Sequence, residues 1–140
     1  MQRIAWFRAV VIAALLGLSG AAPAQSPPPA PGVTRTTLAQ ADLSVPGHET
    51  VVMRVELAPG AEVGWHTHPG EEISYLAQGE LTLLIAGQPP QKRSAGQALV
   101  IPAGVVHNAR SDGAVPAVII AVYVVEKGKP LRAAASAPAH

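Results

Sequence analysis

The feature that most constrains the fold of this chain is the frequent interruption of short apolar segments by glycine and proline. These two residue types account for 27 of the 140 residues, more than in an average protein. The segments between them either alternate apolar and polar residues or are apolar throughout, which is typical of strands. No segment of the predicted domain has a helical period, so we predict one all-β sandwich or barrel. The predicted strands are Glu49–Ala58, Glu72–Gln78, Leu81–Ile85, Gln97–Ile101 and Ala117–Val125.

Charge and cysteine content narrow the chemistry. The 10 basic and 9 acidic residues give a net charge of +1. This balance excludes the basic face expected of a nucleic-acid binder. The sequence has no cysteine, which excludes disulfides, thiolate metal sites and thiol nucleophiles. Any chemistry must therefore use histidine, carboxylates, hydroxyls or a cofactor.

The first 24 residues have the features of a secretory signal peptide. Arg3 and Arg8 precede an apolar stretch, and Ala22-Pro23-Ala24 is a small-residue cleavage site. A membrane anchor is the alternative, but only 14 residues separate Arg8 from Pro23, whereas a spanning helix needs about 20. We therefore expect cleavage after Ala24 and a periplasmic or secreted protein with no membrane segment. Cleavage would remove two basic residues and leave a net charge of −1.

The remainder divides into three predicted parts. Residues 25–32 contain four prolines and are expected to form an extended linker. Residues 33–132 form the folded domain, and the Ala-rich residues 133–140 form a flexible tail. Within the domain, Ala117–Val125 is apolar on both faces, so we expect both faces to be covered. The cover of the outer face is either a partner subunit or the segment Val33–Ala41.

Four residues near turns have the character of metal ligands. His66 and His68 lie two apart, so on a strand they point to the same side, and two imidazoles can share one metal ion. Glu72 follows after the turn Pro69–Gly70, which can bring the next strand back beside the first. His107 follows a later turn and offers a third imidazole. The other histidines, which we expect at the surface, are His48 and His140.

The same residues fall in two motifs that resemble those of the cupin family. The first motif has two histidines, a glutamate and flanking glycines, here Gly60, His66, His68, Glu72 and Gly79. The second is matched by Gly96, Pro102, Gly104 and His107. It usually ends in asparagine, where this chain has Ser111, while Asn108 is out of register. With the flanking strands, the resemblance covers most of Glu49–Val125.

The resemblance implies a double-stranded β-helix, a small jelly-roll barrel. It also implies that one divalent metal ion is bound inside the barrel by His66, His68, Glu72 and His107. Nitrogen and oxygen ligands suit Fe, Mn, Ni, Co or Zn. Many members are homodimers, which agrees with the apolar segment Ala117–Val125.

Two kinds of function are consistent with this resemblance. The first is a periplasmic metal-dependent enzyme, with a dioxygenase like the quercetin-dioxygenase-like cupins as the leading interpretation. A small chelating substrate would then use the coordination positions left open, and Glu72 would be the catalytic base. The alternative is a non-catalytic module that binds a metal ion or a small ligand, because no second acid–base pair accompanies the four residues.

Strand alternation also predicts the wall around the ligands. Counting from Glu72, the residues on its face are Ser74, Leu76 and Gln78. Glu71 is expected at the surface. Arg54 and Glu56 either line the pocket or, as their strand pattern favours, face solvent while Met53, Val55 and Leu57 form core.

Overall fold

The computed structural model describes residues 30–139, and all regular structure within them is β-strand. The described residues accordingly contain no helix able to span a membrane. The predicted signal peptide, most of the predicted linker and His140 lie outside the described residues. The strands are β1 (Val33–Asp42), β2 (His48–Leu57), β3 (His66–Thr67), β4 (Glu71–Gln78), β5 (Glu80–Ile85), β6 (Gln91–Ser94), β7 (Ala98–Ile101), β8 (His107–Ser111), β9 (Ala117–Glu126) and β10 (Ala133–Ala134).

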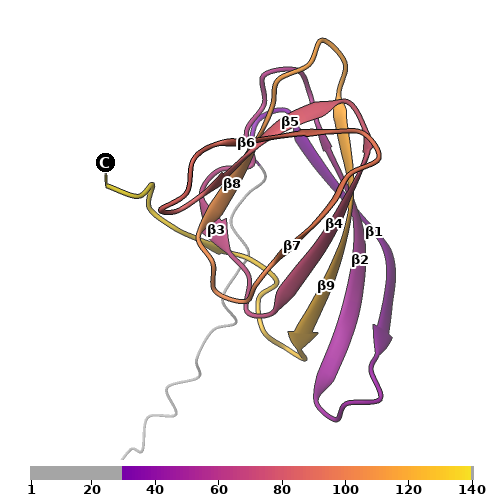
Figure 1. Ribbon diagram of the computed structural model, residues 1–140. Helices are drawn as coiled ribbons and strands as arrows, with labels where there is room; N and C mark the ends of the chain where they lie inside the picture. Colours follow the sequence, from indigo (N-terminus) through magenta and orange to yellow (C-terminus); the bar gives the residue numbers. More distant parts are fainter. Residues whose placement is uncertain (1–29, 140) are drawn as a thin grey trace, which may run out of the picture.

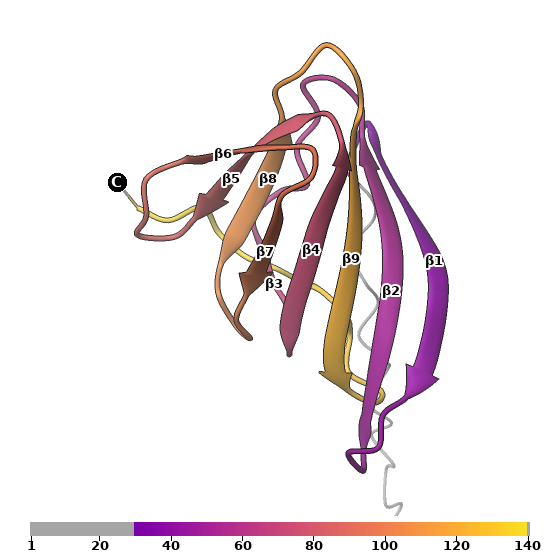
Figure 2. The same cartoon turned by 45° about the vertical axis from the view of Figure 1, so that its right-hand side comes forward.

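The strands form two five-stranded antiparallel sheets (Figure 1). The first has the order β1-β2-β9-β4-β7 and the second β10-β3-β8-β5-β6. Figure 2 shows the long strands of the first sheet side by side, with the shorter strands of the second facing them. The all-β prediction is confirmed, and the two facing sheets have the architecture of a double-stranded β-helix.

The five strands predicted from alternation are present, with ends within one residue of those expected. The strands that we did not predict have weak apolar patterns. β1 is exposed over most of its length and β6 is the polar run Gln-Lys-Arg-Ser. β3 and β10 are two residues each, and β8 is the mostly polar run His-Asn-Ala-Arg-Ser. These segments are strands because they pair with a neighbour, which a single sequence does not record.

β9 lies in the middle of the first sheet, between β2 and β4. Its odd-numbered residues from Ala117 to Val125 are buried, and they face the core between the sheets. Leu57 on β2 and Ala117 on β9 pair across the sheet and are fully buried. The segment Val33–Ala41 does not cover the outer face of β9, because it forms the edge strand β1 and pairs with β2. That alternative for the cover is therefore wrong.

The turn between His68 and Glu72 crosses from one sheet to the other. β3 belongs to the second sheet and β4 to the first, so the start of β4 faces β3 across the barrel. The expectation that the two strands lie side by side is therefore wrong. Gly70 makes the crossing possible. A Cβ atom at this position would lie 1.8 Å from the carbonyl oxygen of Val124 on β9.

We predict that Gly70→Ala lowers the free energy of unfolding by about 3 kcal/mol, because the added methyl overlaps the backbone of β9. Gly87→Ala is the matched control. Gly87 has φ +75° and nothing within 4 Å of its added Cβ, so it should lose only about 1 kcal/mol from backbone strain. Urea titration measures both. Equal losses would show that the crossing tolerates a side chain.

Candidate metal centre

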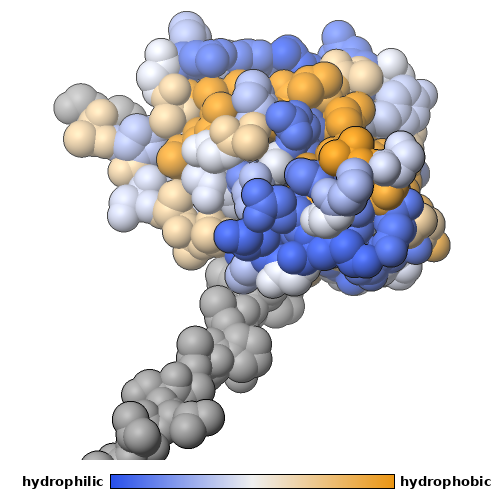
Figure 3. All heavy atoms as spheres, turned by 90° about the horizontal axis from the view of Figure 1, so that it is seen from below, coloured by the Kyte–Doolittle hydropathy of each residue, from blue (hydrophilic) through white to orange (hydrophobic). Residues whose placement is uncertain are grey.

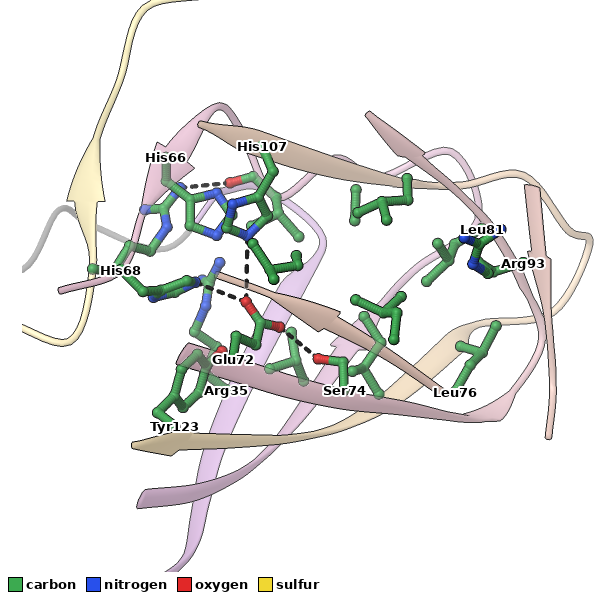
Figure 4. Close-up of a pocket in the computed structure, with 18 residues that line it drawn as sticks. Arg35, His66, His68, Glu72, Ser74, Leu76, Leu81, Arg93, His107 and Tyr123 are labelled. Carbon is green, nitrogen blue, oxygen red and sulfur yellow. Dashed lines mark hydrogen bonds and ion pairs between the residues drawn. The ribbon is translucent and has the colours of Figure 1, made fainter. Parts of the chain in front are cut away.

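The four predicted ligands come together inside the barrel. His66 and His68 lie on and just after β3, Glu72 lies near the start of β4, and His107 is the first residue of β8. Each offers a ligand atom, and these atoms all lie within 4.8 Å of one another. All four residues are buried, with 2% to 7% of their surface exposed. Figure 4 shows the three imidazoles on one side of the cavity and the Glu72 carboxylate opposite them.

Each histidine ring is oriented by a hydrogen bond from Nδ1 to a backbone carbonyl. The acceptors are Gly64 for His66 (2.7 Å), Leu131 for His68 (2.6 Å) and Val105 for His107 (2.9 Å). A carbonyl oxygen only accepts, so Nδ1 carries the proton in every ring. The neutral rings therefore present bare Nε2 lone pairs to the site, which is the tautomer that binds metal ions through Nε2.

The Glu72 carboxylate faces these lone pairs. Its Oε2 lies 2.9 Å from Nε2 of His68 and 3.3 Å from Nε2 of His107. Its Oε1 accepts a hydrogen bond of 2.5 Å from Ser74. Among the described residues, neither Oε2 of Glu72 nor Nε2 of His68 has a hydrogen-bond partner, although both atoms are buried. Two buried acceptors facing each other are unfavourable unless a proton or a metal cation lies between them. A divalent ion would satisfy the carboxylate and the three imidazoles together, so this donor set fits a metal ion.

The electrostatics set the protonation states of two of the four residues, His66 and Glu72. Burial, followed by repulsion from His107, lowers the pKa of His66 to about 3. Burial alone would raise the pKa of Glu72. Its close approach to His107 and His68 outweighs burial and holds that pKa well below the usual value. His66 is therefore neutral and Glu72 ionised near neutral pH.

The loop before His66 is held by a buried side chain that we had set aside. Asn108 is 1% exposed. Its Oδ1 accepts from the backbone N–H of Gly64 at 2.9 Å, and its Nδ2 donates to Glu62 at 3.1 Å. Asn108 lies out of register with the second motif, so its position beside His107 was the only signal. Its amide fixes the loop whose Gly64 carbonyl orients His66.

The C-terminal segment also contributes to the site. The carbonyl of Leu131 orients His68, and Arg132 donates to the carbonyl of Val63 at 2.9 Å. The residues that we predicted to be a flexible tail begin with β10, which pairs with β3. The N–H of Ala135 then donates to the carbonyl of Trp65 at 3.0 Å. Residues 131–135 thus run along the strand that carries the histidines.

The cavity at this centre has a volume of about 50 Å³. Ser74 and Leu76 line it, as predicted. Gln78 does not, because the register shifts between Leu76 and Gln78 and the side chain turns outward to donate to the carbonyl of Pro116. The prediction for Gln78 was therefore wrong, and the β-bulge is the reason.

The expected surface positions are outside the cavity. Arg54 and Glu56 form an ion pair with each other and do not line it. Glu71 is exposed. Arg54, Glu56 and Glu71 alternate with core residues of β2 and β4, and this alternation correctly predicted that they lie outside the cavity.

Four polar residues that sequence reasoning missed also line the cavity: Arg35, Arg93, Tyr123 and Arg132. Arg35 pairs with Val55 on the inner face of the first sheet, and Tyr123 pairs with Val51. The alternation along β9 predicts that the Tyr123 side chain points into the barrel. That of Arg35 was not, because β1 was not predicted as a strand.

The surface at the ligand end of the barrel is mixed. β4 and β8 begin at the lower end of the molecule in Figure 1. Seen from below in Figure 3, this end has a hydrophobic area bordered by hydrophilic bands. Small-molecule sites commonly combine apolar and polar surface in this way.

Comparison with known proteins gives consistent matches. The family model of the cupin domain matches residues 53–123. Nectarin-1 of Nicotiana langsdorffii x Nicotiana sanderae is 32% identical over 91 residues, and the match covers 56% of this chain and 38% of that protein. The chain thus spans well under half the length of this relative.

Solved structures agree. A cupin-like protein of Thermotoga maritima matches with a TM-score of 0.62 and 26% identity, over 74% of this chain and 75% of that one. A recombinant oxalate oxidase in complex with glycolate matches with a TM-score of 0.58 and 26% identity, over 74% of this chain and 55% of the oxidase. The family match covers half of the chain, and the structure has two facing sheets. The chain therefore belongs to the cupin family.

Proposed function

We propose that this protein is a metal-dependent enzyme of the dioxygenase type that acts on a small chelating substrate. The observation that carries the proposal is the pair of buried, unsatisfied atoms at its centre, Nε2 of His68 and Oε2 of Glu72. We further propose that the protein is periplasmic or secreted after cleavage behind Ala24, on the strength of the signal-like residues 1–24.

The described residues prepare the site before any substrate arrives. The backbone carbonyls hold the rings of His66, His68 and His107 with their lone pairs inward. When bound there, a divalent ion such as Fe, Mn, Ni, Co or Zn would polarise a substrate oxygen, and iron would also supply electrons to dioxygen. The buried position of the ligands keeps bulk water away and strengthens every charge interaction at the centre.

Glu72 is the proposed base. Among the described residues that line the cavity, it is the one with a carboxylate. While it lies beside His68 and His107 its pKa is low, so it is ionised but weakly basic. Movement away from them into the apolar cavity would raise that pKa, because burial would then dominate. Ser74 donates to Oε1 and orients the carboxylate for such proton transfer.

The size of the cavity favours a small substrate. About 10–15 Å³ on this measure holds one water molecule, so 50 Å³ admits only a few heavy atoms. The structurally similar oxalate oxidase was solved with glycolate, a small oxygen ligand. We therefore propose a substrate of comparable size that chelates through oxygen.

A non-catalytic module that binds metal or a small ligand is the second candidate. It is favoured by the apolar wall, which includes Leu81, Leu83 and Ile119, and by the lack of a further carboxylate among the described lining residues. The two candidates differ in turnover and not in metal content.

We also propose that two copies of the chain pair through the outer face of the first sheet. Val100, Ile73 and Val122 lie in one row across β7, β4 and β9. Val100 is 63% exposed and Ile73 38%, and neighbouring Tyr75 is 48% exposed. Residues 33–42 do not cover this row, since β1 pairs at the far edge. Exposed apolar groups in contact with one another favour a partner surface.

We predict about one divalent ion per chain in protein that begins at Gln25, measured by mass spectrometry of the metals. His66→Ala/His68→Ala should retain little, because two of four ligands are lost. His48→Ala is the control and should keep its metal, since the His48 ring hydrogen-bonds to the carbonyl of Pro46 and does not line the cavity. A wild-type protein that stays metal-free after reconstitution would contradict the metal centre.

We expect iron-loaded protein to consume dioxygen with at least one member of a panel of diols and diketones, measured with an oxygen electrode. Glu72→Gln should lower turnover about 100-fold or more through loss of the base. Glu71→Gln, an exposed neighbour, is the matched control and should be active. Bound iron without turnover of any panel member would favour the binding module.

We predict a dimer of the wild type in light scattering after gel filtration. Val100→Glu should give a monomer, because it buries a charge in the proposed interface. Val45→Glu is the control, since Val45 is equally apolar and 54% exposed but lies in the turn between β1 and β2. A wild-type monomer, or a Val100→Glu dimer, would rule out this interface.

A further inference from the structure

Two arginines in the cavity have unsatisfied donors. Nη2 of Arg35 and Nε of Arg132 are buried, and neither has a hydrogen-bond partner among residues 30–139. Both residues line the same cavity as the metal ligands. Glu72 attracts Arg35 electrostatically but is not its hydrogen-bond acceptor, because the close contacts of Glu72 are with His68, His107 and Ser74. A buried N–H of a cation without an acceptor is costly, so these atoms indicate a missing acceptor.

The two arginines and Tyr123 lie close enough to influence one another electrostatically. Burial is the main cause that lowers the pKa of Arg35, and Tyr123 and Glu72 act against it. Burial also lowers the pKa of Arg132, and the nearby charge of Arg35 lowers it further. Burial, followed by the charge of Glu72, keeps the Tyr123 hydroxyl protonated far above its usual pKa. Two cations and a hydroxyl donor thus share one region with a single carboxylate, Glu72, so positive charge and unsatisfied donors are in excess there.

This region lies at the metal end of the cavity. Figure 4 shows Arg35 and Tyr123 next to Glu72 and His68, whereas Arg93 lies at the opposite end. Nη1 of Arg93 already donates to the carbonyl of Lys92 at 3.0 Å, and its Nη2 donates to the side chain of Gln91 at 2.5 Å. The missing acceptor therefore belongs beside the ligand cluster.

We propose that Arg35, assisted by Arg132 and Tyr123, binds the carboxylate of a small organic acid whose adjacent oxygen reaches the ligand cluster. This inference rests on the proposed function, since it names the substrate class of the same site. The planar guanidinium of Arg35 matches a carboxylate with two parallel N–H groups. The substrate is then a short 2-hydroxy or 2-oxo acid, because the cavity admits only a few heavy atoms.

Calorimetric titration tests this with a matched pair of probes. Glycolate and glycolamide share the hydroxyl and are similar in size, but an uncharged amide with an NH2 donor replaces the carboxylate in glycolamide. Both are titrated into protein expressed from the full-length sequence, in metal-loaded and metal-free form, with metal content measured in parallel. We expect glycolate to bind about 10- to 100-fold more tightly than glycolamide, the preference of a charge-assisted hydrogen bond.

Variants assign the preference to a residue. Arg35→Gln should abolish the preference for glycolate and leave metal content unchanged, and Arg35→Lys should keep only part of it. Arg54→Gln is the control, because Arg54 pairs with Glu56 and does not line the cavity. A preference lost in Arg93→Gln but kept in Arg35→Gln would place the anion at the wrong end and overturn the proposal.

The remaining outcomes separate this inference from the metal-dependent function. Equal binding of glycolate and glycolamide by metal-loaded wild type would overturn the carboxylate subsite and leave the metal centre standing. A glycolate preference in protein that takes up no metal would support the subsite and contradict the proposed function. Binding of inorganic phosphate without glycolate would replace the carboxylate by another anion and so overturn the assignment. The comparison of glycolate with glycolamide uses the wild-type protein alone, so it is valid even if a variant fails to fold.

Discussion

The structure depends on three hydrogen bonds between imidazole Nδ1 atoms and backbone carbonyls. They turn the lone pairs of His66, His68 and His107 toward one point inside the barrel, where the Glu72 carboxylate also lies. Without a cation these acceptors repel one another, and their burial prevents water from relieving the repulsion. The four residues therefore form a buried acceptor cluster that fits a metal ion, and the rest of the barrel holds this cluster in place.

Two facing sheets provide the rigidity for this arrangement. The histidines come from the second sheet and Glu72 from the first, so neither sheet alone contains the donor set. Gly70 sets how closely the connection passes β9, and Asn108 fixes the loop before His66. Small changes in sheet spacing would alter the distances between ligand atoms, which makes barrel packing part of the chemistry.

Much of the fold was predictable, because alternation along β2, β4 and β9 reflects burial on one face. The four ligands stood out because residue type and spacing both marked them. Arg35 did not, since an edge strand with mostly exposed residues has no apolar pattern. The prediction for Gln78 was wrong because a β-bulge shifts the strand register before it and turns its side chain to the other face of the sheet. Such a bulge has no clear signal in the sequence. Whether Glu72 lay beside the histidines or across from them depended on sheet assignment, a long-range property.

The contact between His68 and Leu131 joins residues that are 63 positions apart. The ring of His68 therefore acquires its final orientation only after nearly the whole chain has been synthesised and folded. A chain synthesised as far as His107 already contains all four candidate ligands but lacks the carbonyl that orients His68. The candidate site is thus completed only when the C-terminal segment docks against β3.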